Sequence, residues 1–303
     1  MTQSPRRRVS LRALAVLTTK EETDMLFLYI ALPTIVVLLG VWLFLIAPGK
    51  NSKMDYYKTK KYAHRGLHGT VGSDTFCAEN SLTAFSRAVE RGFGIELDVR
   101  LSKDGELIVF HDATLDRVTN GSGKVSDFTL QQLKQLSLMG TEDTIPTFTE
   151  VLELVGGKVP LLVEIKEEGM DHSISEKTAE LLSGYGGEFI VESFSPLAFG
   201  AIKQSMPGVP CGFLADKLTE NEKYRSFKYR IIQRFLLNFI ARPAFIAMNY
   251  ERPNMFPLPI LRTLFRVPVV AWTVRSKEAE EEAYKNGFCT VIFENYLPDS
   301  ADN

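Results

Sequence analysis

Residues 94–100 read Gly-Ile-Glu-Leu-Asp-Val-Arg, and residues 161–166 read Leu-Leu-Val-Glu-Ile-Lys. Side chains alternate between the two faces of a strand, so Glu96 and Asp98 share one face while apolar residues fill the other. Glu164 and Lys166 share a face of the second stretch in the same way. A single strand of this kind also fits a sheet edge with a solvated acidic face. Two of them favour a barrel, in which several strands bring charged side chains to one end.

Apolar runs of strand length recur on both sides of these stretches. They lie at residues 62–64, 94–100, 106–111, 160–166, 188–194, 210–215, 244–249, 268–274 and 290–294. Helical stretches lie between most of them, at 81–91 with Asn80 as the expected N-cap, 148–155, 172–182, 196–204 and 277–286. This alternation predicts parallel βαβ units, and about 240 residues of it suit an α/β fold of the (β/α)₈ TIM-barrel type better than a doubly wound sheet. There are nine candidate strands for a barrel of eight, and the sequence does not show which one lies outside the barrel.

The stretch from Met25 to Ala47 contains no charged residue and is long enough to cross a bilayer core of about 30 Å. A signal peptide has a shorter apolar region and a small-residue cleavage site, and a buried core helix has a polar face. Neither fits well, so we expect one N-terminal transmembrane helix. The expected organisation is a tail at residues 1–24, a transmembrane helix at 25–47, a linker at 48–61 and a barrel domain at 62–298.

Composition narrows the class of protein further. The 303 residues include 45% hydrophobic and 24% charged residues, which excludes a disordered chain, a collagen-like repeat and a multi-span membrane protein. With 35 Lys and Arg against 37 Asp and Glu, the chain has no basic excess to bind nucleic acid phosphates. The three cysteines, Cys77, Cys211 and Cys289, are too few and too widely spaced for a disulfide framework or a zinc site.

The side of the membrane on which the barrel lies depends on the basic residues that flank the apolar stretch. Arg6, Arg7, Arg8, Arg12 and Lys20 precede it, and Lys50, Lys53, Lys58, Lys60 and Lys61 follow it. This count is tied, but translation from Met25 would remove the preceding residues and place the barrel in the cytoplasm. Unpaired cysteines fit a reducing compartment as well. We therefore expect a single-pass protein of the cell membrane with a cytoplasmic catalytic domain.

The polar residues inside and after the strands suggest a chemistry. Glu96, Asp98 and Glu164 would form an all-oxygen site, which suits Mg²⁺ or Ca²⁺ better than Zn²⁺. His64 and His111 end two strands, and histidine gives and takes protons near neutral pH. Arg65 and Lys166 are suited to hold a phosphate. Together these residues indicate cleavage of a phosphate ester. His68 and His172 lack such neighbours in the sequence, and we expect them at the surface.

Six short motifs in order resemble the glycerophosphodiester phosphodiesterase family across residues 60–298. They are His-Arg-Gly at 64–66, Glu-Asn-Ser at 79–81, Glu-Leu-Asp-Val at 96–99, Val-Phe-His-Asp at 109–112, Glu-Ile-Lys at 164–166 and Trp-Thr-Val at 272–274. The resemblance implies a TIM barrel with a small insertion, which we expect at 116–129. It also implies that His64 and His111 are the acid and base, that Glu96, Asp98 and Glu164 hold the metal, and that Arg65 and Lys166 contact the phosphate. Glu79 would lie near the metal or support its ligands, and Trp272 would lie against the substrate or belong to the barrel core.

Three positions depart from the family pattern. Ala78 replaces the proline that usually precedes Glu-Asn, a change that concerns the entry into a helix. Arg275 stands where asparagine is common, and Glu294 stands near the end of the last strand, where the family usually has aspartate. The last two changes are expected to alter substrate preference rather than to remove catalysis.

The implied reaction is hydrolysis of a glycerophosphodiester to glycerol 3-phosphate and an alcohol, in glycerophospholipid metabolism. Water or the neighbouring glycerol hydroxyl is the nucleophile, and the sequence does not decide between them. One alternative is a phospholipase or lysophospholipase that acts on membrane lipids, with residues 229–240 and 255–265 touching lipid. The periodicity of 229–240 fits an outer barrel helix better, with a core stripe of Ile232, Phe235, Leu236 and Phe239. A second alternative is an inactive, membrane-tethered binding protein, but such a protein would be expected to lose site residues that this chain retains.

Overall fold

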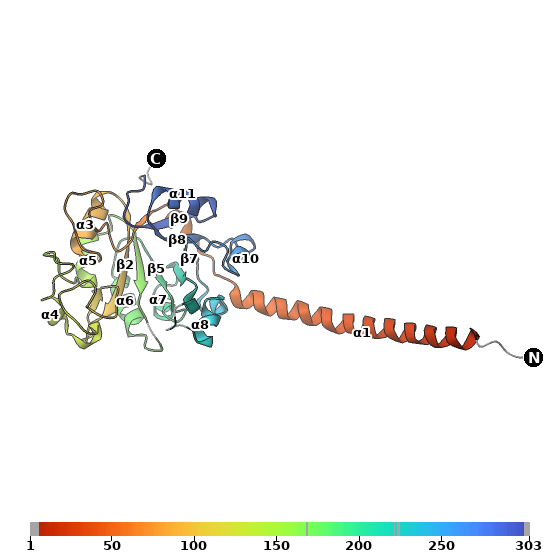
Figure 1. Ribbon diagram of the computed structural model, residues 1–303. Coiled ribbons are helices and arrows are strands. Elements are labelled where there is room, and N and C mark those ends of the chain that lie inside the picture. The colour runs from red at the N-terminus through yellow and green to blue at the C-terminus, as the bar shows by residue number, and fades with distance from the viewer. Residues whose placement is uncertain (1–5, 168, 221, 223–224, 300–303) are drawn as a thin grey trace, which may run out of the picture. The chain divides into compact units, whose positions relative to one another are not determined.

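A computed structural model describes residues 6–167, 169–220, 222 and 225–299, with side chains from Met25 onward. The chain forms two compact units, Met1–Leu45 and Ile46–Asn303. Helix α1 begins at Arg6 and ends at Ile46, so it starts well before the apolar stretch (Figure 1). Its segment Met25–Ile46 is long and apolar enough to cross a membrane, with a mean hydropathy of 2.5.

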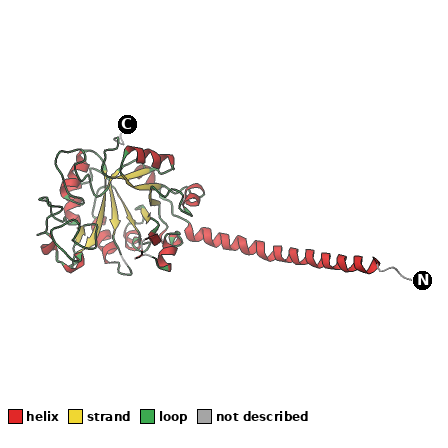
Figure 2. Ribbon diagram, viewed as in Figure 1, coloured by secondary structure: helices red, strands yellow, loops and turns green. Residues whose placement is uncertain are grey.

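The second unit contains a closed barrel of eight parallel strands. These are β1 (Tyr62–Ala63), β2 (Gly94–Leu101), β4 (Leu161–Ile165), β5 (Phe189–Ser193), β6 (Cys211–Ala215), β7 (Phe245–Asn249), β8 (Val269–Val274) and β9 (Thr290–Phe293). Strand β1 pairs with both β2 and β9, and this double pairing closes the barrel. Figure 2 shows the strands enclosed by helices and loops. The predicted TIM-type barrel is therefore confirmed.

The ninth apolar run is not a barrel strand. Its central residues form β3 (Leu107–Val109), which pairs with β2 in the antiparallel direction and extends the barrel wall as a hairpin. Only a few residues separate β2 from β3, which is too short for the crossover that a parallel neighbour requires. The connection length therefore decides which of the nine runs lies outside the barrel.

Short helices connect the strands. They are α2 (Met54–Tyr57), α3 (Leu82–Glu90), α4 (Leu130–Leu133), α5 (Phe148–Val155), α6 (Ser173–Ser183), α7 (Phe199–Ser205), α8 (Phe227–Ile232), α9 (Asn238–Ala241), α10 (Leu258–Thr263) and α11 (Lys277–Lys285), with 3₁₀ turns at Val125–Asp127 and Leu218–Glu220. Helix α5 has the boundaries that its sequence predicts, because Thr147 and Glu150 form a capping box and Gly156 ends the helix in the left-handed conformation.

The N-cap of α3 is Ser81, and the prediction of Asn80 was wrong. The Ser81 hydroxyl accepts a hydrogen bond from the Ala84 amide, as an N-cap side chain does. Asn80 has a φ of 52°, in the left-handed region that asparagine tolerates better than most residues. Its side chain is thereby free to reach into the barrel instead of capping the helix.

Residues 46–61 are more ordered than a plain linker. The Ile46 carbonyl accepts a hydrogen bond of 2.9 Å from the buried side chain of Asn238. Helix α2 then places Met54 and Tyr57 against Tyr62 and other barrel residues, and these form one buried apolar cluster. The barrel unit therefore includes most of the segment that the sequence suggests is a connection.

Two further sequence expectations need correction. The insertion is longer than residues 116–129, since residues as far along as Leu133, Leu138 and Ile145 pack in one apolar cluster with Leu115, and with Ala78, Ile108 and Phe110 outside the insertion. Residues 229–240 do not form one helix. They are divided between α8 and α9, with Phe235 at a φ of 58° between them. Ile232 and Phe235 are buried as the periodicity predicts, but Phe239 is exposed.

Candidate functional site

Four carboxylates lie side by side on three neighbouring strands of the barrel. Asp98 of β2 is directly opposite Glu164 of β4, and Glu164 is directly opposite Glu192 of β5. Glu96 lies one inward-facing position before Asp98 on β2. All four side chains are buried. This excludes the alternative interpretation of residues 94–100 as an edge strand with a solvated acidic face. The predicted triad therefore comes together inside the barrel, and one carboxylate oxygen from each member lies within 4.8 Å of the others.

Glu192 was not singled out from the sequence. It is 1% exposed, and its Oε2 atom has no hydrogen-bond partner among the described residues. Burial and the charges of Glu164 and Asp98 raise its pKa well above the usual range of a glutamate. The available signal was its position, because Glu192 follows apolar residues as Glu164 does. Glu188 shares its face in the predicted run 188–194, but β5 begins only at Phe189.

Two cations lie among these acids. The Lys166 ammonium is 2.9 Å from Asp98 Oδ1 and 2.6 Å from Glu164 Oε1, and its pKa is raised by these carboxylates despite burial. The Arg65 backbone amide donates a hydrogen bond of 2.8 Å to Glu96 Oε2. The Arg65 guanidinium is 3.5 Å from Asp98 Oδ2 and donates a 2.8 Å bond to Glu79. The predicted phosphate-binding residues therefore lie directly beside the predicted metal-binding residues.

The carboxylates differ in how readily they ionise. Burial tends to raise the pKa of each, and like charges raise the pKa of Glu96 further, well above its usual range. Burial likewise raises the pKa of Glu164 to about 7. For Asp98 the charges of Lys166, His111 and Arg65 outweigh burial and hold its pKa well below the usual range. Acids that are buried together in this way are stabilised by an added positive charge.

The segment before α3 supports Asp98 and Arg65. Asn80 donates a side-chain hydrogen bond of 2.8 Å to Asp98 Oδ2, and its backbone amide donates to the Arg65 carbonyl at 2.9 Å. Glu79 is buried and accepts hydrogen bonds from Arg65 and from Arg117 of the insertion. The two arginines outweigh burial and lower the pKa of Glu79. Glu79 therefore supports Arg65 rather than a member of the acidic triad, while the sequence did not single out Asn80 and Arg117.

His64 follows β1 and is held by a carboxylate from the last strand. Its Nδ1 atom is 2.7 Å from Glu294 Oε2, and its Nε2 atom is 4.0 Å from Glu96 Oε2. Burial lowers the pKa of His64 to about 4, although the bond to Glu294 opposes the shift. Because Glu294 is ionised, it fixes the proton on Nδ1 and leaves Nε2 facing the acidic site. Arg275 lies 3.5 Å from the same Glu294 oxygen, so the two departures from the family pattern are in contact.

His111 is brought to the site by the β2–β3 hairpin rather than by a barrel strand. Its Nδ1 atom is 2.6 Å from Asp112 Oδ1, and Arg117 binds the other oxygen of Asp112 at 2.6 Å. Burial lowers the pKa of His111, with Lys166 and Arg65 acting in the same direction. His64 and His111 are therefore arranged alike, each with Nδ1 bound to a carboxylate and Nε2 available.

The other predicted residues differ in their surroundings. Trp272 of β8 packs against the apolar cluster inside the barrel and meets Phe194 edge to face, with ring centroids 6.1 Å apart. His68 is not the surface residue that the sequence suggests, whereas the His172 side chain is 37% exposed, as expected. His68 is half-buried, and burial lowers its pKa. The His172 Nδ1 atom is 2.8 Å from the buried carboxylate of Glu167.

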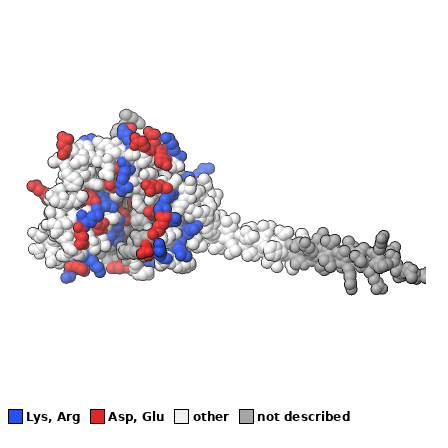
Figure 3. Space-filling model, viewed as in Figure 1, with Lys and Arg blue, Asp and Glu red and all other residues white. Residues whose placement is uncertain are grey.

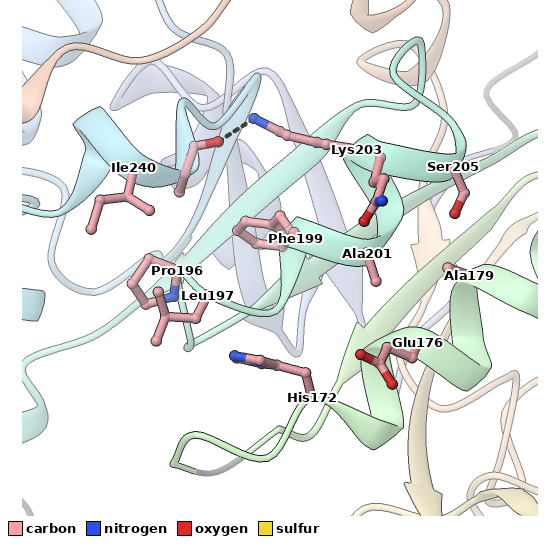
Figure 4. Close-up of a pocket in the computed structure, with 13 residues that line it drawn as sticks. His172, Glu176, Ala179, Pro196, Leu197, Phe199, Ala201, Lys203, Ser205 and Ile240 are labelled. Atoms are coloured by element: carbon pink, nitrogen blue, oxygen red, sulfur yellow. Dashed lines mark hydrogen bonds between the residues drawn. The ribbon is translucent and has the colours of Figure 1, made fainter.

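A groove of about 580 Å³ lies between α6 and α7; His172 is one of its lining residues, and none of the residues of the acidic cluster lines it. Figure 4 shows His172 and Glu176 of the α6 region facing α7 across it, with Lys203 directed to a backbone carbonyl. Lys203 Nζ donates to the carbonyls of Ala241 and Arg242, so its charge is engaged. On the face of the barrel in Figure 3, acidic and basic side chains are intermixed, in agreement with the absence of a basic excess in the sequence.

Known proteins resemble this chain in sequence and in fold. Residues 64–293 match the model of the glycerophosphoryl diester phosphodiesterase family. A glycerophosphodiester phosphodiesterase of Caldanaerobacter subterraneus is 41% identical over 168 residues, which are 52% of this chain and 67% of the relative. Another, of Bacillus subtilis, is 28% identical over 249 residues, 73% of this chain and 81% of the relative. A phosphodiesterase of Oleispira antarctica, solved in complex with the product sn-glycerol-3-phosphate, has a similar fold, with a TM-score of 0.62. The two sequences are 24% identical, and the match covers 77% of this chain and 92% of that one.

Proposed function

The chain belongs to the glycerophosphoryl diester phosphodiesterase family and is a phosphoric diester hydrolase, and on that premise we propose that it cleaves glycerophosphodiesters to glycerol 3-phosphate and an alcohol with the help of a divalent cation. The observation that carries the proposal is the cluster of Glu96, Asp98 and Glu164 beside Lys166 and Arg65. It combines ligands for a cation with donors for a phosphate in one buried place.

The donor set fits a hard divalent cation, Mg²⁺ or Ca²⁺. The three carboxylates offer only oxygen, no cysteine or histidine belongs to this triad, and burial disfavours their ionised forms unless a positive charge is added. Glu96, Asp98 and Glu164 would hold the ion, and Asn80 would keep Asp98 in place through its hydrogen bond. A bound ion would supply charge stabilisation for the phosphate oxygens.

Arg65 and Lys166 would bind the non-bridging phosphate oxygens. Arg65 is held by Glu79, which in turn is held by Arg117, so its guanidinium is fixed before substrate arrives. The Lys166 ammonium lies between Asp98 and Glu164. A phosphate held by a cation on these carboxylates would therefore lie close to it. Trp272 would provide an apolar wall for the glycerol or the alcohol of the substrate.

His64 and His111 would move the protons. Each has Nδ1 bound to a carboxylate, Glu294 or Asp112, which leaves Nε2 as the atom that exchanges a proton. One histidine would take the proton of the attacking hydroxyl or water, and the other would protonate the leaving alcohol. Glu294 and Asp112 would stabilise the imidazolium as it forms, as carboxylate partners of catalytic histidines do.

We also propose that Met25–Ile46 is a single-pass membrane anchor and that the barrel lies on the cytoplasmic side. The segment is apolar, and almost none of it is buried in the protein. Its apolar surface therefore requires another environment, such as a lipid bilayer. An anchored enzyme of this class would act in glycerophospholipid metabolism, near the lipids from which its substrates derive.

The test uses the full chain in detergent, with glycerophosphodiesters that differ in the alcohol and with lysophospholipids, each assayed with Mg²⁺, Ca²⁺ or chelator. We expect release of glycerol 3-phosphate from the soluble diesters, dependent on the cation. Release of a different product, or turnover of lysophospholipids alone, would contradict the proposal. Residues 229–240 give the lipid-directed alternative no support, because they do not form the continuous helix that would lie on a membrane.

A further inference from the structure

A second group of metal-binding side chains lies beside the acidic triad. One donor atom each of His64, His68 and Glu294 lies within 4.8 Å of the other two. The residues come from the end of β1, from the loop that follows it, and from the end of β9. Two imidazoles and one carboxylate form a different donor set from the three carboxylates of the triad. Such a set suits a borderline cation such as Zn²⁺, whereas Mg²⁺ and Ca²⁺ prefer oxygen.

His68 supplies an independent observation. Its Nε2 atom is buried and has no hydrogen-bond partner among the described residues. A buried polar atom of this kind needs an explanation, because leaving it unpaired costs about 1–3 kcal/mol. His68 has no role in the proposed hydrolysis, so catalysis does not account for its position.

The geometry needs only a small adjustment. Four-coordinate zinc with bonds of about 2.0–2.2 Å holds its ligand atoms roughly 3.3–3.6 Å apart. His64 Nδ1 and Glu294 Oε2 are already 2.7 Å apart because they share a proton. An ion between them would occupy Nδ1, the ring proton would lie on Nε2 instead, and rotation of the half-buried His68 side chain would complete a site of three protein ligands.

We propose that His64, His68 and Glu294 form an inhibitory site for Zn²⁺ or a cation of similar preference, separate from the site of the activating cation. This inference rests on the proposed role of His64. When Nδ1 binds the ion, the single proton of the neutral imidazole moves from Nδ1 to Nε2. His64 Nε2 then cannot alternate between its free and its protonated form, which either of the two proposed roles of His64 requires, so the hydrolysis stops while Mg²⁺ stays on the triad.

The experiment first measures Zn²⁺ binding by equilibrium dialysis of the full chain in detergent, with Mg²⁺ in large excess to saturate the triad. We expect one bound Zn²⁺ in the wild type and at least about tenfold weaker binding in His68→Gln, since loss of even a supporting residue of a metal site costs that much. His172→Gln is the matched control, because His172 also contacts a carboxylate but lies outside the group, and it should bind Zn²⁺ like the wild type. His68→Asn serves as a second variant if His68→Gln melts at a lower temperature.

The same proteins are then assayed for hydrolysis with and without Zn²⁺. His68→Gln should keep the basal rate and lose at least about tenfold in sensitivity to Zn²⁺. Equal Zn²⁺ binding by the wild type and His68→Gln, or loss of binding only in Glu164→Gln, would place the ion on the triad and overturn the inference. Zn²⁺ binding that depends on His68 but leaves the rate unchanged would uphold the site and refute the role proposed for His64, so the two failures are distinguishable.

Discussion

Replacing Glu294 by glutamine separates two effects that a carboxylate has on its histidine partner. The 2.7 Å bond from His64 Nδ1 to Glu294 Oε2 both orients the ring and places a negative charge where an imidazolium would form. The amide oxygen of the introduced glutamine is able to accept the same hydrogen bond, but it carries no charge. Glu294→Gln therefore removes the charge and keeps the orientation, whereas Glu294→Ala removes both.

The expected magnitudes follow from this hydrogen bond. A bond to a charged group contributes about 1.5–3 kcal/mol and a bond between neutral groups about 0.5–1.5 kcal/mol, so the charge accounts for about 1–1.5 kcal/mol. Glu294→Gln should then lower kcat about five- to twelvefold, at about 1.4 kcal/mol for each factor of ten. Glu294→Ala should lower kcat roughly ten- to a hundredfold on the same scale. KM should change little in both variants, because Glu294 contacts the histidine and not the phosphate.

The assay is steady-state hydrolysis of a soluble glycerophosphodiester at saturating Mg²⁺, with thermal melting to show that each variant is folded. Arg275→Gln is the control, since Arg275 is 3.5 Å from the same oxygen but 56% exposed, and an exposed pair contributes only about 0–1 kcal/mol. Wild-type turnover in Glu294→Gln, or equal losses in the glutamine and alanine variants, would refute the division into charge and orientation.

The acidic triad, the histidine pair and the apolar helix each lead to one further prediction. Excess chelator should abolish turnover, and Asp98→Ala should weaken binding of the activating cation, measured by titration of Mg²⁺; full activity in chelator would remove the triad as a metal site. His64→Ala and His111→Ala should each lower kcat on the order of 10²–10⁴-fold, and the double variant should lose much less than the product, because residues that act in one step are not additive. Protease added to intact cells or spheroplasts should leave the barrel uncut, and digestion without lysis would show that it lies on the outer side of the membrane.

The fold could be predicted because the alternation of apolar strands and helices is regular over the whole barrel. The errors come from contacts that a local pattern does not contain. Whether residues 107–109 lie in the barrel or in a hairpin depends on which strand they pair with. Both Asn80 and Ser81 are good N-cap residues, and the choice depends on Asp98, which the Asn80 side chain binds instead.

The candidate site could be predicted in part for a related reason. Glu96, Asp98, Glu164 and Lys166 stand out because charged residues at alternate positions of an apolar strand are costly without a function. Glu192 is the one charged residue of β5 and was missed, although the register places it next to Glu164. The partner of His64 is 230 positions away in the sequence, so only the closure of the barrel between β1 and β9 reveals the role of Glu294.

The buried charges at the mouth of the barrel provide a final argument for a divalent cation. Glu96, Asp98, Glu164 and Glu192 bring four carboxylates into one place, and Arg65 and Lys166 bring two cations among them. Glu79 is largely compensated by Arg117 and adds little to this balance. If all four acids are ionised, two negative charges remain, and one divalent cation would neutralise them. Without a cation, the raised pKa values of Glu96, Glu164 and Glu192 mean that these acids retain protons, which also reduces the excess negative charge. Glu192 is therefore expected to act through the charge of the site even where it does not bind the ion itself.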